Sequence, residues 1–500
     1  MIGNALTLTW IFPLLTALMC CFVSTHDHLK IKKLSLIGSF FNLILVCYIL
    51  FKFMTVKAIP GSDAVIFRST HTWFSILNIN YQIGIDGISI LMMLLTAIVI
   101  FCGVLASWPI VSQAKEFFIM LNVLVAGVFG VFISLDLFTF FVFYEIAVLP
   151  MYLLIGLWGT GKKEYSAMKL TLMLVAGSAL ILAGILALYF ESGNITGTNS
   201  FDLLTLSNIK FSSEFQNWVF PALFVGFGVL GALYPFHTWS PDGHASAPTA
   251  VSMLHAGVLM KLGGYGCLRI AMFICPEGCQ EWMPFFLILV TINVVYGAFA
   301  ALKQTDLKYV TAYSSVSHCG LVLFGFTAMT QLGFQGAVLQ MISHGLMTAL
   351  FFCLIGMIYG RTHTRIMTEM GGLMKVIPFL GVAFVICGLA GLGLPSLSGF
   401  VAEITIFMGS FENPNLINRV CTVLAILSII TTAVYVLRTA NSMLSGPLNE
   451  KYSDLKDASF IEKLPVIILL FCLFAMGIMP AWIVEIVNEA IVPIFENVNR

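Results

Sequence analysis

The chain has 500 residues, of which 59% are hydrophobic and only 10% are Asp, Glu, Lys or Arg. Soluble proteins carry roughly 25% charged residues, so this composition excludes a soluble enzyme and indicates a protein that lies in a lipid bilayer. The formal net charge is zero, which gives no reason to expect nucleic acid as a partner.

Apolar segments long enough to span a bilayer follow one another along the whole sequence. A helix needs about 20 mostly apolar residues to cross a bilayer, and about fourteen such segments are present. Runs such as "LVAGVFGVFIS" are apolar on all sides, which excludes the alternating strands of a membrane β-barrel. The sequence therefore predicts an all-α polytopic membrane protein that forms a single membrane domain over residues 1–500. The predicted helices cover approximately residues 2–23, 34–53, 85–106, 117–134, 136–158, 166–190, 218–236, 250–274, 282–302, 309–328, 334–360, 376–410, 419–444 and 463–490.

Lys and Arg are divided unevenly between the two sets of connecting loops. Roughly two-thirds of them, Lys308 included, lie in or beside the loops that follow odd-numbered helices, whereas Arg269 is on the other side. Because cytoplasmic loops carry the excess of positive charge, we expect the first set in the cytoplasm and both chain termini outside. Lys261 belongs to neither set, since it lies near the middle of predicted helix 250–274.

The twelve cysteines are mostly single residues in apolar runs, so we expect them to act as small hydrophobic side chains. No iron–sulfur or zinc spacing is present. In "CPEGC", Cys275 and Cys279 could form a disulfide in an outward loop.

Helix breakers interrupt two regions of the predicted bundle. Prolines between residues 235 and 248 interrupt the seventh and eighth helices, and "GLAGLGLPSLSGF", residues 388–400, interrupts the twelfth. Proline and glycine free backbone groups at membrane depth, which is tolerated only where protein or water covers them. Paired broken helices in the two halves of a transporter indicate an ion path. We therefore predict two inverted repeats of five helices each, over residues 116–274 and 282–444.

Four acidic or basic residues in the predicted helices need an explanation, because a charge at the centre of a span costs roughly 2.5 to 3.5 kcal/mol. Glu145 is in the fifth helix, Lys261 in the eighth, and Glu403 follows the break in the twelfth. Any one of them could be a structural charge paired to a neighbouring helix. Two carboxylates and an amine in separate helices favour a proton relay, because buried groups of both kinds can titrate near neutral pH. Asp136 begins the fifth helix and is a candidate supporting residue, whereas Asp86 is expected to be an interfacial cap.

Histidines lie in and between these helices. His318 and His344 fall in neighbouring predicted helices that separate Lys261 from the twelfth helix, which favours a relay role for both, although a single buried histidine could equally be structural. His237 and His244 flank the proline-rich break and are expected to line a water-accessible approach to Lys261 from the cytoplasmic side.

The segment "PFHTWSPDGHASAPTAVSMLHAGVLMK" resembles the P-x-H-x-W-L-P-D-A-H-x-x-A-P-T segment of the antiporter-like subunits of respiratory complex I. "AYSSVSHCG", "SHGLMTALFF", "RTHTRIMTEMGGL" and "LPSLSGFVAE" follow in that family's order and at its spacing, so the resemblance covers nearly the whole chain. Among these subunits the chain is most similar to subunit M, chain four in mitochondria, because Glu403 occupies the place where the L and N subunits usually have lysine.

The resemblance implies a proton-translocating membrane-arm subunit of NADH:quinone oxidoreductase, which couples electron transfer to proton pumping. By residue-by-residue transfer, Glu145 is the fifth-helix glutamate and Lys261 the central lysine. His318 and His344 are then the bridging histidines, and Glu403 is the outward release group. Lys169 matches the basic residue of the sixth helix.

The same resemblance implies partners and a cellular setting. This chain is expected to hold no cofactor and to perform no redox chemistry, with NADH, FMN, Fe–S clusters and quinone bound by partner subunits. L-like and N-like antiporter subunits and the lipid bilayer are the implied neighbours. We expect the inner (plasma) membrane of a bacterium rather than an organellar membrane.

One position departs from the family pattern. The family's seventh helix carries a lysine that pairs with the fifth-helix glutamate, but Leu230 stands at that position and no Lys or Arg occurs from residue 211 to 260. An unpaired buried carboxyl favours its neutral form. We therefore hypothesise that water or Lys169 supports Glu145 in this chain.

Two other classes share many of these residues. One is a subunit of a multisubunit Mrp-type Na⁺/H⁺ antiporter, which has no redox partner, and the other is a subunit of a membrane-bound hydrogenase. A purely structural helix bundle is a further alternative. Fold alone does not separate these classes, whereas the proteins that co-purify with the chain do.

Overall fold

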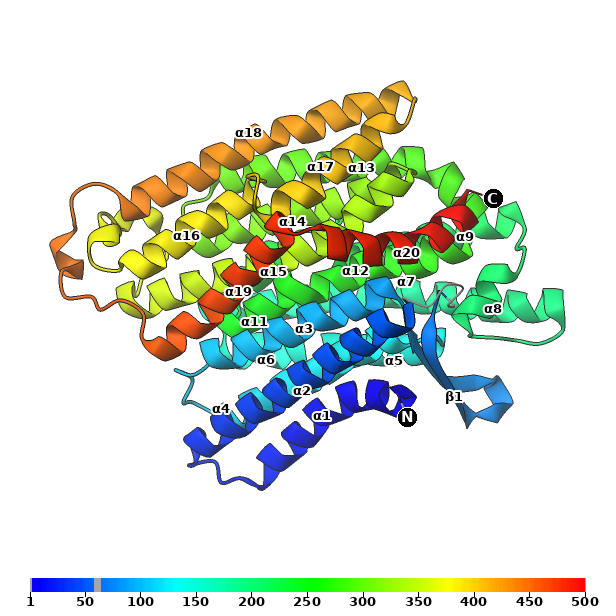
Figure 1. The fold of residues 1–500 in the computed structure, drawn as a ribbon, viewed down its shortest axis with the longest axis horizontal. Helices are drawn as coiled ribbons and strands as arrows, with labels where there is room; N and C mark the ends of the chain where they lie inside the picture. The colour runs from blue at the N-terminus through cyan, green and yellow to red at the C-terminus, as the bar shows by residue number, and fades with distance from the viewer. Residues whose placement is uncertain (1, 58–63, 500) are drawn as a thin grey trace.

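The computed structural model describes residues 2–57 and 64–499, which form a bundle of helices with roughly parallel axes (Figure 1). Among these residues, ten helices are long and apolar enough to cross a membrane. The all-α polytopic membrane fold is thereby confirmed. The larger count of about fourteen spans and the two inverted repeats stay predictions.

The N-terminal part of the bundle contains seven of the described helices. The predicted span 136–158 is present as one candidate membrane span, Leu137–Trp158, which Pro150 divides into two helices, α5 and α6, because proline lacks a backbone donor. The helices of this part are α1 (Ile2–Phe22), α2 (His28–Lys57), α3 (Gly87–Ala106), α4 (Ala114–Ile133), α5 (Leu137–Val148), α6 (Pro150–Trp158) and α7 (Lys163–Thr196).

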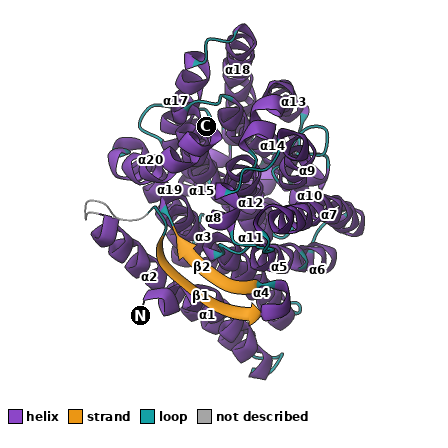
Figure 2. Ribbon diagram, turned by 90° about the vertical axis from the view of Figure 1, so that its right-hand side faces the viewer, coloured by secondary structure: helices purple, strands orange, loops and turns teal. Residues whose placement is uncertain are grey.

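A two-stranded antiparallel hairpin, β1 (Ile66–Phe74) and β2 (Ile79–Ile85), covers one end of this part of the bundle (Figure 2). Its turn uses Asn78 with a φ of 52°, a left-handed conformation that asparagine tolerates better than most residues. Asp136, at the start of α5, accepts hydrogen bonds from Asn80 N at 3.1 Å and Thr139 N at 2.9 Å. The predicted supporting residue Asp136 therefore caps α5 and holds the hairpin. The sequence did not predict this hairpin.

The middle of the chain contains the first break. Helix α9 ends at Leu230 and α10 begins at Trp239, which confirms the interruption expected from the prolines. The region predicted as the eighth helix is not a continuous α-helix, because π-turns over His255–Leu259 and Cys267–Met272 flank a short α-helical stretch. The helices here are α8 (Leu203–Asn208), α9 (Ser213–Leu230), α10 (Trp239–Ser246), α11 (Thr249–Leu254), α12 (Met260–Gly266), α13 (Pro276–Lys303), α14 (Leu307–Thr327) and α15 (Gln331–Thr362).

The last part of the chain contains the second break. The chain leaves the helix at Gly391 and re-enters one at Ser398, as the sequence predicts. Predicted helix 463–490 is wrong as a single helix, because Pro480 separates two helices. The helices are α16 (Pro378–Gly391), α17 (Ser398–Glu412), α18 (Leu416–Leu444), α19 (Phe460–Ile478) and α20 (Ala481–Val498). Short 3₁₀ turns cover Ser75–Leu77, Met367–Glu369, Leu373–Lys375 and Glu450–Tyr452.

Helix α15 lies at the centre of the bundle. In its most apolar window 94% of the residues are buried, compared with 28% in α2 and in α19. A membrane helix shielded from lipid in this way can hold polar side chains at the level of the hydrocarbon, because its neighbours supply their partners. Gln340, Ser343, His344 and Thr348 of α15 are accordingly buried in protein. The hairpin, α8 and the C-terminus lie together at one end of the bundle (Figure 1).

Candidate functional site

Lys261 lies on α12, between the two π-turns, and its side chain is 1% exposed. A π-turn replaces the ordinary i to i−4 hydrogen bond, so it changes which backbone carbonyls are free. The Lys261 ammonium donates to the carbonyl of Ala256 in the first π-turn and lies 2.7 Å from His344 Nδ1 on α15. The buried lysine therefore reaches one backbone acceptor and one titratable ring.

His344 and His318 bring α15 and α14 together. Their ring centroids are 5.2 Å apart and the rings are nearly parallel, at 26°. Gln340 Nε2 lies 3.1 Å from His318 Nδ1, and Cys319 Sγ lies 3.9 Å from His344 Nδ1. The Nε2 atoms of both histidines are buried without a hydrogen-bond partner in the part of the chain that the structure describes. Each ring thus has a nitrogen free to take or give a proton.

Glu403 completes the line on α17, where its Oε1 lies 3.5 Å from His318 Nδ1. The break before α17 leaves room for the Glu403 carboxylate at Gly393. This glycine has a φ of +73°, and a Cβ there would lie 2.5 Å from Glu403 Oε2. A cavity of about 10 Å³ is lined by His318 and Glu403 and also by Ser317, Ser428 and Thr432. That volume is close to what one water molecule needs.

The structure therefore brings four predicted relay residues into one line across four helices. In order they are Lys261 on α12, His344 on α15, His318 on α14 and Glu403 on α17. The segments are far apart in sequence, so only the tertiary fold places these side chains in contact.

Glu145, unlike these four residues, has no contact with another predicted relay residue. Its Oε1 is buried without a hydrogen-bond partner among the described residues, and Ser178 on α7 is the side chain within hydrogen-bonding reach. Leu230, at the end of α9, is 1% exposed and supplies no charge. The carboxyl predicted as the first relay group is therefore separate from the line that starts at Lys261.

Lys169 does not support Glu145, contrary to our hypothesis. Its Nζ lies 2.7 Å from Asp242 Oδ2 on α10, and both side chains are about one-quarter exposed. Tyr309 OH donates to the other oxygen of Asp242 at 3.0 Å. The proline-rich segment itself thus supplies the partner of Lys169, because it carries Asp242 back towards α7.

The side chains of His244 and His237 contact different parts of the bundle. His244 Nε2 lies 3.3 Å from the Sδ of Met260, the residue before Lys261, and its ring is 4.5 Å from that of His255. His237 instead packs between the rings of Tyr234 and Tyr296, at 5.6 and 5.1 Å. Of the two predicted approach residues, His244 contacts Met260, the residue before Lys261, while His237 lies against Tyr296 of α13.

A buried ion pair was missed by the sequence reasoning. Arg269 Nη1 lies 2.7 Å from Asp86 Oδ2, and both side chains are almost fully buried. Asp86 Oδ1 also accepts from Ser89 N at 2.8 Å, so its predicted capping role at α3 is confirmed. Tyr265 OH reaches Ser89 Oγ at 3.0 Å. The signal was present in the sequence, because Lys261, Tyr265 and Arg269 recur every fourth residue, although Arg269 was assigned to an outer loop.

Lys308 was also assigned to a loop and is instead buried in the first turn of α14. Cys275 and Cys279 are free thiols, so the possible disulfide between them is wrong. Both cysteines are buried, in agreement with the expectation that cysteines here act as small hydrophobic side chains.

Broken membrane helices around a line of buried ionisable groups are typical of ion-translocating membrane proteins. Within that class, this chain belongs to the NADH:quinone oxidoreductase/Mrp antiporter transmembrane family, whose sequence profile matches residues 134–432. That segment includes every predicted relay residue.

Individual relatives narrow the comparison. The chain is 37% identical over 434 residues to "NAD(P)H-quinone oxidoreductase chain 4 3" of Picosynechococcus sp., covering 86% of this chain and 78% of that protein. It is similar to a chain of respiratory complex I from Thermus thermophilus, with a TM-score of 0.89, 25% identity and 99% of each chain covered. A chain of the Mrp complex from Dietzia sp. has the same fold, with a TM-score of 0.84, 19% identity, and 99% and 98% of the two chains covered.

Proposed function

We propose that this chain is the chain-four, subunit M, component of the membrane arm of an NAD(P)H:quinone oxidoreductase and that it translocates protons. The observation that carries the proposal is the line of contacts from Lys261 through His344 and His318 to Glu403. Membership of the family and the identity to relatives named as chain 4 support the assignment to the oxidoreductase.

The geometry supports a stepwise proton transfer. A proton on the Lys261 ammonium can pass to His344 Nδ1, since the two nitrogens are 2.7 Å apart. Imidazole accepts a proton on one nitrogen and releases one from the other, which suits both histidines to the middle of the line. Glu403 then receives the proton from His318. Each occupied site changes the proton affinity of the next, so charge arriving from a neighbouring subunit can drive the sequence.

The free energy needed to move a proton across the membrane can be compared with the interaction between buried charges. Moving one elementary charge against 100 mV costs about 2.3 kcal/mol. Charged groups separated by helix-to-helix distances in a dry interior interact by amounts of this order. The proposed line therefore needs no cofactor of its own. NADH, FMN, Fe–S clusters and quinone would be bound by partner subunits, and L-like and N-like antiporter subunits would be the membrane neighbours.

The proposed setting is the inner membrane of a bacterium, with the loops after odd-numbered predicted helices in the cytoplasm and both termini outside. In this orientation Lys261 receives protons from the cytoplasmic end of the bundle, beside α10 and the start of α14. Glu403 releases them towards the opposite end.

Two experiments test the proposal. Purification of the chain in mild detergent is expected to bring flavin and iron–sulfur proteins with it. Nickel–iron subunits would instead assign it to a hydrogenase, and small membrane proteins alone would assign it to an antiporter.

The second experiment measures NADH-driven proton uptake by inverted membrane vesicles. Glu403→Gln is expected to abolish most of the uptake per electron transferred, whereas Glu412→Gln, an exposed position on the same helix, leaves it unchanged. If Glu403→Gln pumps protons as well as the wild type, the proposed proton transfer through Glu403 is wrong.

A further inference from the structure

A polar cavity of about 610 Å³ opens at the cytoplasmic end of the bundle. It lies between α7, α10 and α14 and reaches the surface at Gly161 and Lys162, which are exposed. Its inner wall includes Ser246 and Tyr309. These residues are immediate neighbours of Ala247 and Lys308, so the cavity ends where α10 meets the first turn of α14. Lys308 does not line the cavity itself, but its ammonium donates to the carbonyl of Ala247, the residue that follows Ser246 of the wall.

Lys308 is placed unusually for a lysine. Its side chain is 5% exposed, and its ammonium donates to the carbonyl of Ala247. No carboxylate forms an ion pair with it among residues 2–57 and 64–499. A lysine buried with a single acceptor is not explained by a structural ion pair, and amines in such sites can exchange a proton.

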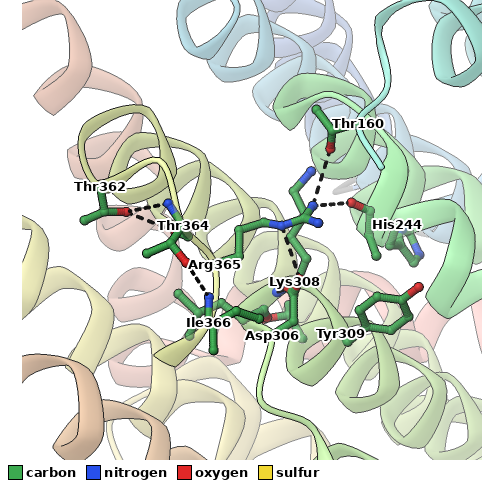
Figure 3. A network of polar contacts seen from close by, with 12 residues as sticks. Thr160, His244, Asp306, Lys308, Tyr309, Thr362, Thr364, Arg365 and Ile366 are labelled. Carbon is green, nitrogen blue, oxygen red and sulfur yellow. Dashed lines mark hydrogen bonds and ion pairs between the residues drawn. The ribbon is translucent and has the colours of Figure 1, made fainter. Parts of the chain in front are cut away.

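The nearest carboxylate already has another partner. Asp306 Oδ1 caps α14 by accepting from Lys308 N at 2.8 Å, and its Oδ2 lies 3.2 Å from Arg365 Nε. Arg365 Nη1 also donates to the carbonyl of Ala245 at 2.6 Å and reaches the Thr160 hydroxyl at 3.5 Å. Figure 3 shows this guanidinium extending from Asp306 towards Thr160, with Lys308 and His244 on neighbouring elements. Arg365 thus connects the walls of the cavity, and the Asp306 carboxylate is engaged by the Arg365 guanidinium and the Lys308 backbone rather than by the Lys308 ammonium.

On the inner side of Lys308 lies His244. Lys308 donates to the carbonyl of Ala247, three residues after His244, and Figure 3 shows the two side chains on neighbouring elements. Ser252 Oγ connects His244 to Ala247, since it lies 3.1 Å from the His244 carbonyl and 3.4 Å from the Ala247 carbonyl. A methionine sulfur accepts but does not donate hydrogen bonds, so the contact of Nε2 with Met260 assigns the ring hydrogen to Nε2. His244 Nδ1, which is buried without a partner among the described atoms, is then the free base.

We infer that Lys308 is the first proton-carrying residue of the chain, taking protons from this cavity and passing them to His244 and on towards Lys261. The inference rests on the proposed proton translocation. The Lys308 amine takes one proton from cavity water and becomes an ammonium. It returns to the amine when the proton moves, through an intervening water, to His244 Nδ1. One proton enters and one leaves, and no electron is transferred. The charged and titratable groups facing Lys308 are Asp306, Arg365 and His244.

The test compares Lys308→Met and Lys308→Arg in the assembled complex. Proton uptake per electron is measured in inverted vesicles energised with NADH. Arginine keeps the positive charge and can keep the Ala247 hydrogen bond but does not release a proton, so both variants are expected to lower uptake about threefold or more. Lys303→Met, an exposed lysine at the end of α13, is the matched control and should pump normally.

Two results would overturn the inference: normal pumping by Lys308→Arg, which would reduce Lys308 to a fixed charge, or normal pumping by Lys308→Met. Where Lys308→Met fails to assemble, the arginine variant alone decides. Lys261→Met separates this inference from the proposed function. If the line from Lys261 is correct and Lys308 is not part of it, Lys261→Met stops pumping while Lys308→Arg does not. If the proposed function itself fails, Lys261→Met pumps normally.

Discussion

The two sides of Lys261 differ in how completely their polar groups are connected. Towards α17, His344, His318 and Glu403 follow one another at 2.7 Å, 5.2 Å between ring centroids, and 3.5 Å. Towards α5, Glu145 has one orphaned carboxyl oxygen and a serine neighbour, and Leu230 stands where related proteins are expected to have a lysine. One side is a continuous line of titratable groups, and the other is an isolated carboxyl.

This difference indicates which groups can act together. Titratable groups within a few ångströms alter one another's proton affinity, so the α17 side can respond as a unit. Among the described residues, Glu145 has no ion pair and no contact with a residue of that line. The difference predicts that substitutions on the α17 side have larger effects on pumping than substitutions on the α5 side.

The largest effect is expected for Lys261→Met. Methionine removes the only cation of the line and leaves His344 without its 2.7 Å neighbour. We expect proton uptake per electron in inverted vesicles to fall about tenfold or more, within the range that removal of a proton-transfer group produces. An equal loss in Lys303→Met, at an exposed lysine outside the line, would contradict a specific role for Lys261.

The next largest effect is expected for Gly393→Ala. A Cβ at this position would lie 2.5 Å from Glu403 Oε2, so the carboxylate has to move away from His318. Gly446→Ala is a matched control, because Gly446 also has a positive φ, +86°, but a Cβ there meets nothing within 4 Å.

Both alanine variants should lose about 1 kcal/mol of stability from the left-handed backbone, measured as thermal loss of the assembled complex. Only Gly393→Ala should also lower proton uptake, by a few-fold, roughly 1 kcal/mol or more of lost coupling. Equal pumping by the two variants would mean that the position of Glu403 is not critical.

A smaller effect is expected for Glu145→Gln, about two- to threefold in proton uptake, since Glu145 is outside the continuous line. Full pumping by this variant would remove any role for Glu145. Leu230→Lys should restore the missing partner of Glu145. The substitution should therefore lower the stability of the assembled complex more in a Glu145→Gln background than in the wild type, by a coupling free energy of about 0.5 to 3 kcal/mol. Equal cost in both backgrounds would show that the two positions do not interact.

The smallest effect is expected for Asp242→Asn. Its ion pair with Lys169 is about one-quarter exposed on both sides, and pairs of this kind contribute about 1 kcal/mol or less. Thermal stability of the complex should change little, and pumping should stay within about twofold of wild type. A loss as large as that of Lys261→Met would contradict the small effect expected and would show that Asp242, which also lines the 610 Å³ cavity, is itself required for proton entry.

The sequence by itself determined the membrane fold, both helix breaks and the identities of the relay candidates. Hydropathy is a local property, so the spans follow from runs of apolar residues. Breaks follow from Pro235 and from the glycines before Ser398, because backbone restrictions act within a few residues. A charge such as Lys261 is conspicuous in an apolar run whatever it contacts.

Only the tertiary structure decided which polar groups meet. Lys169 pairs with Asp242 rather than Glu145, and Arg269 pairs with Asp86, more than 180 residues earlier in the chain. Lys308 is buried although its sequence position reads as a loop. Partner choice in a bundle depends on the rotation of each helix and on which segments from distant parts of the chain pack against it, and these are properties of the assembled fold.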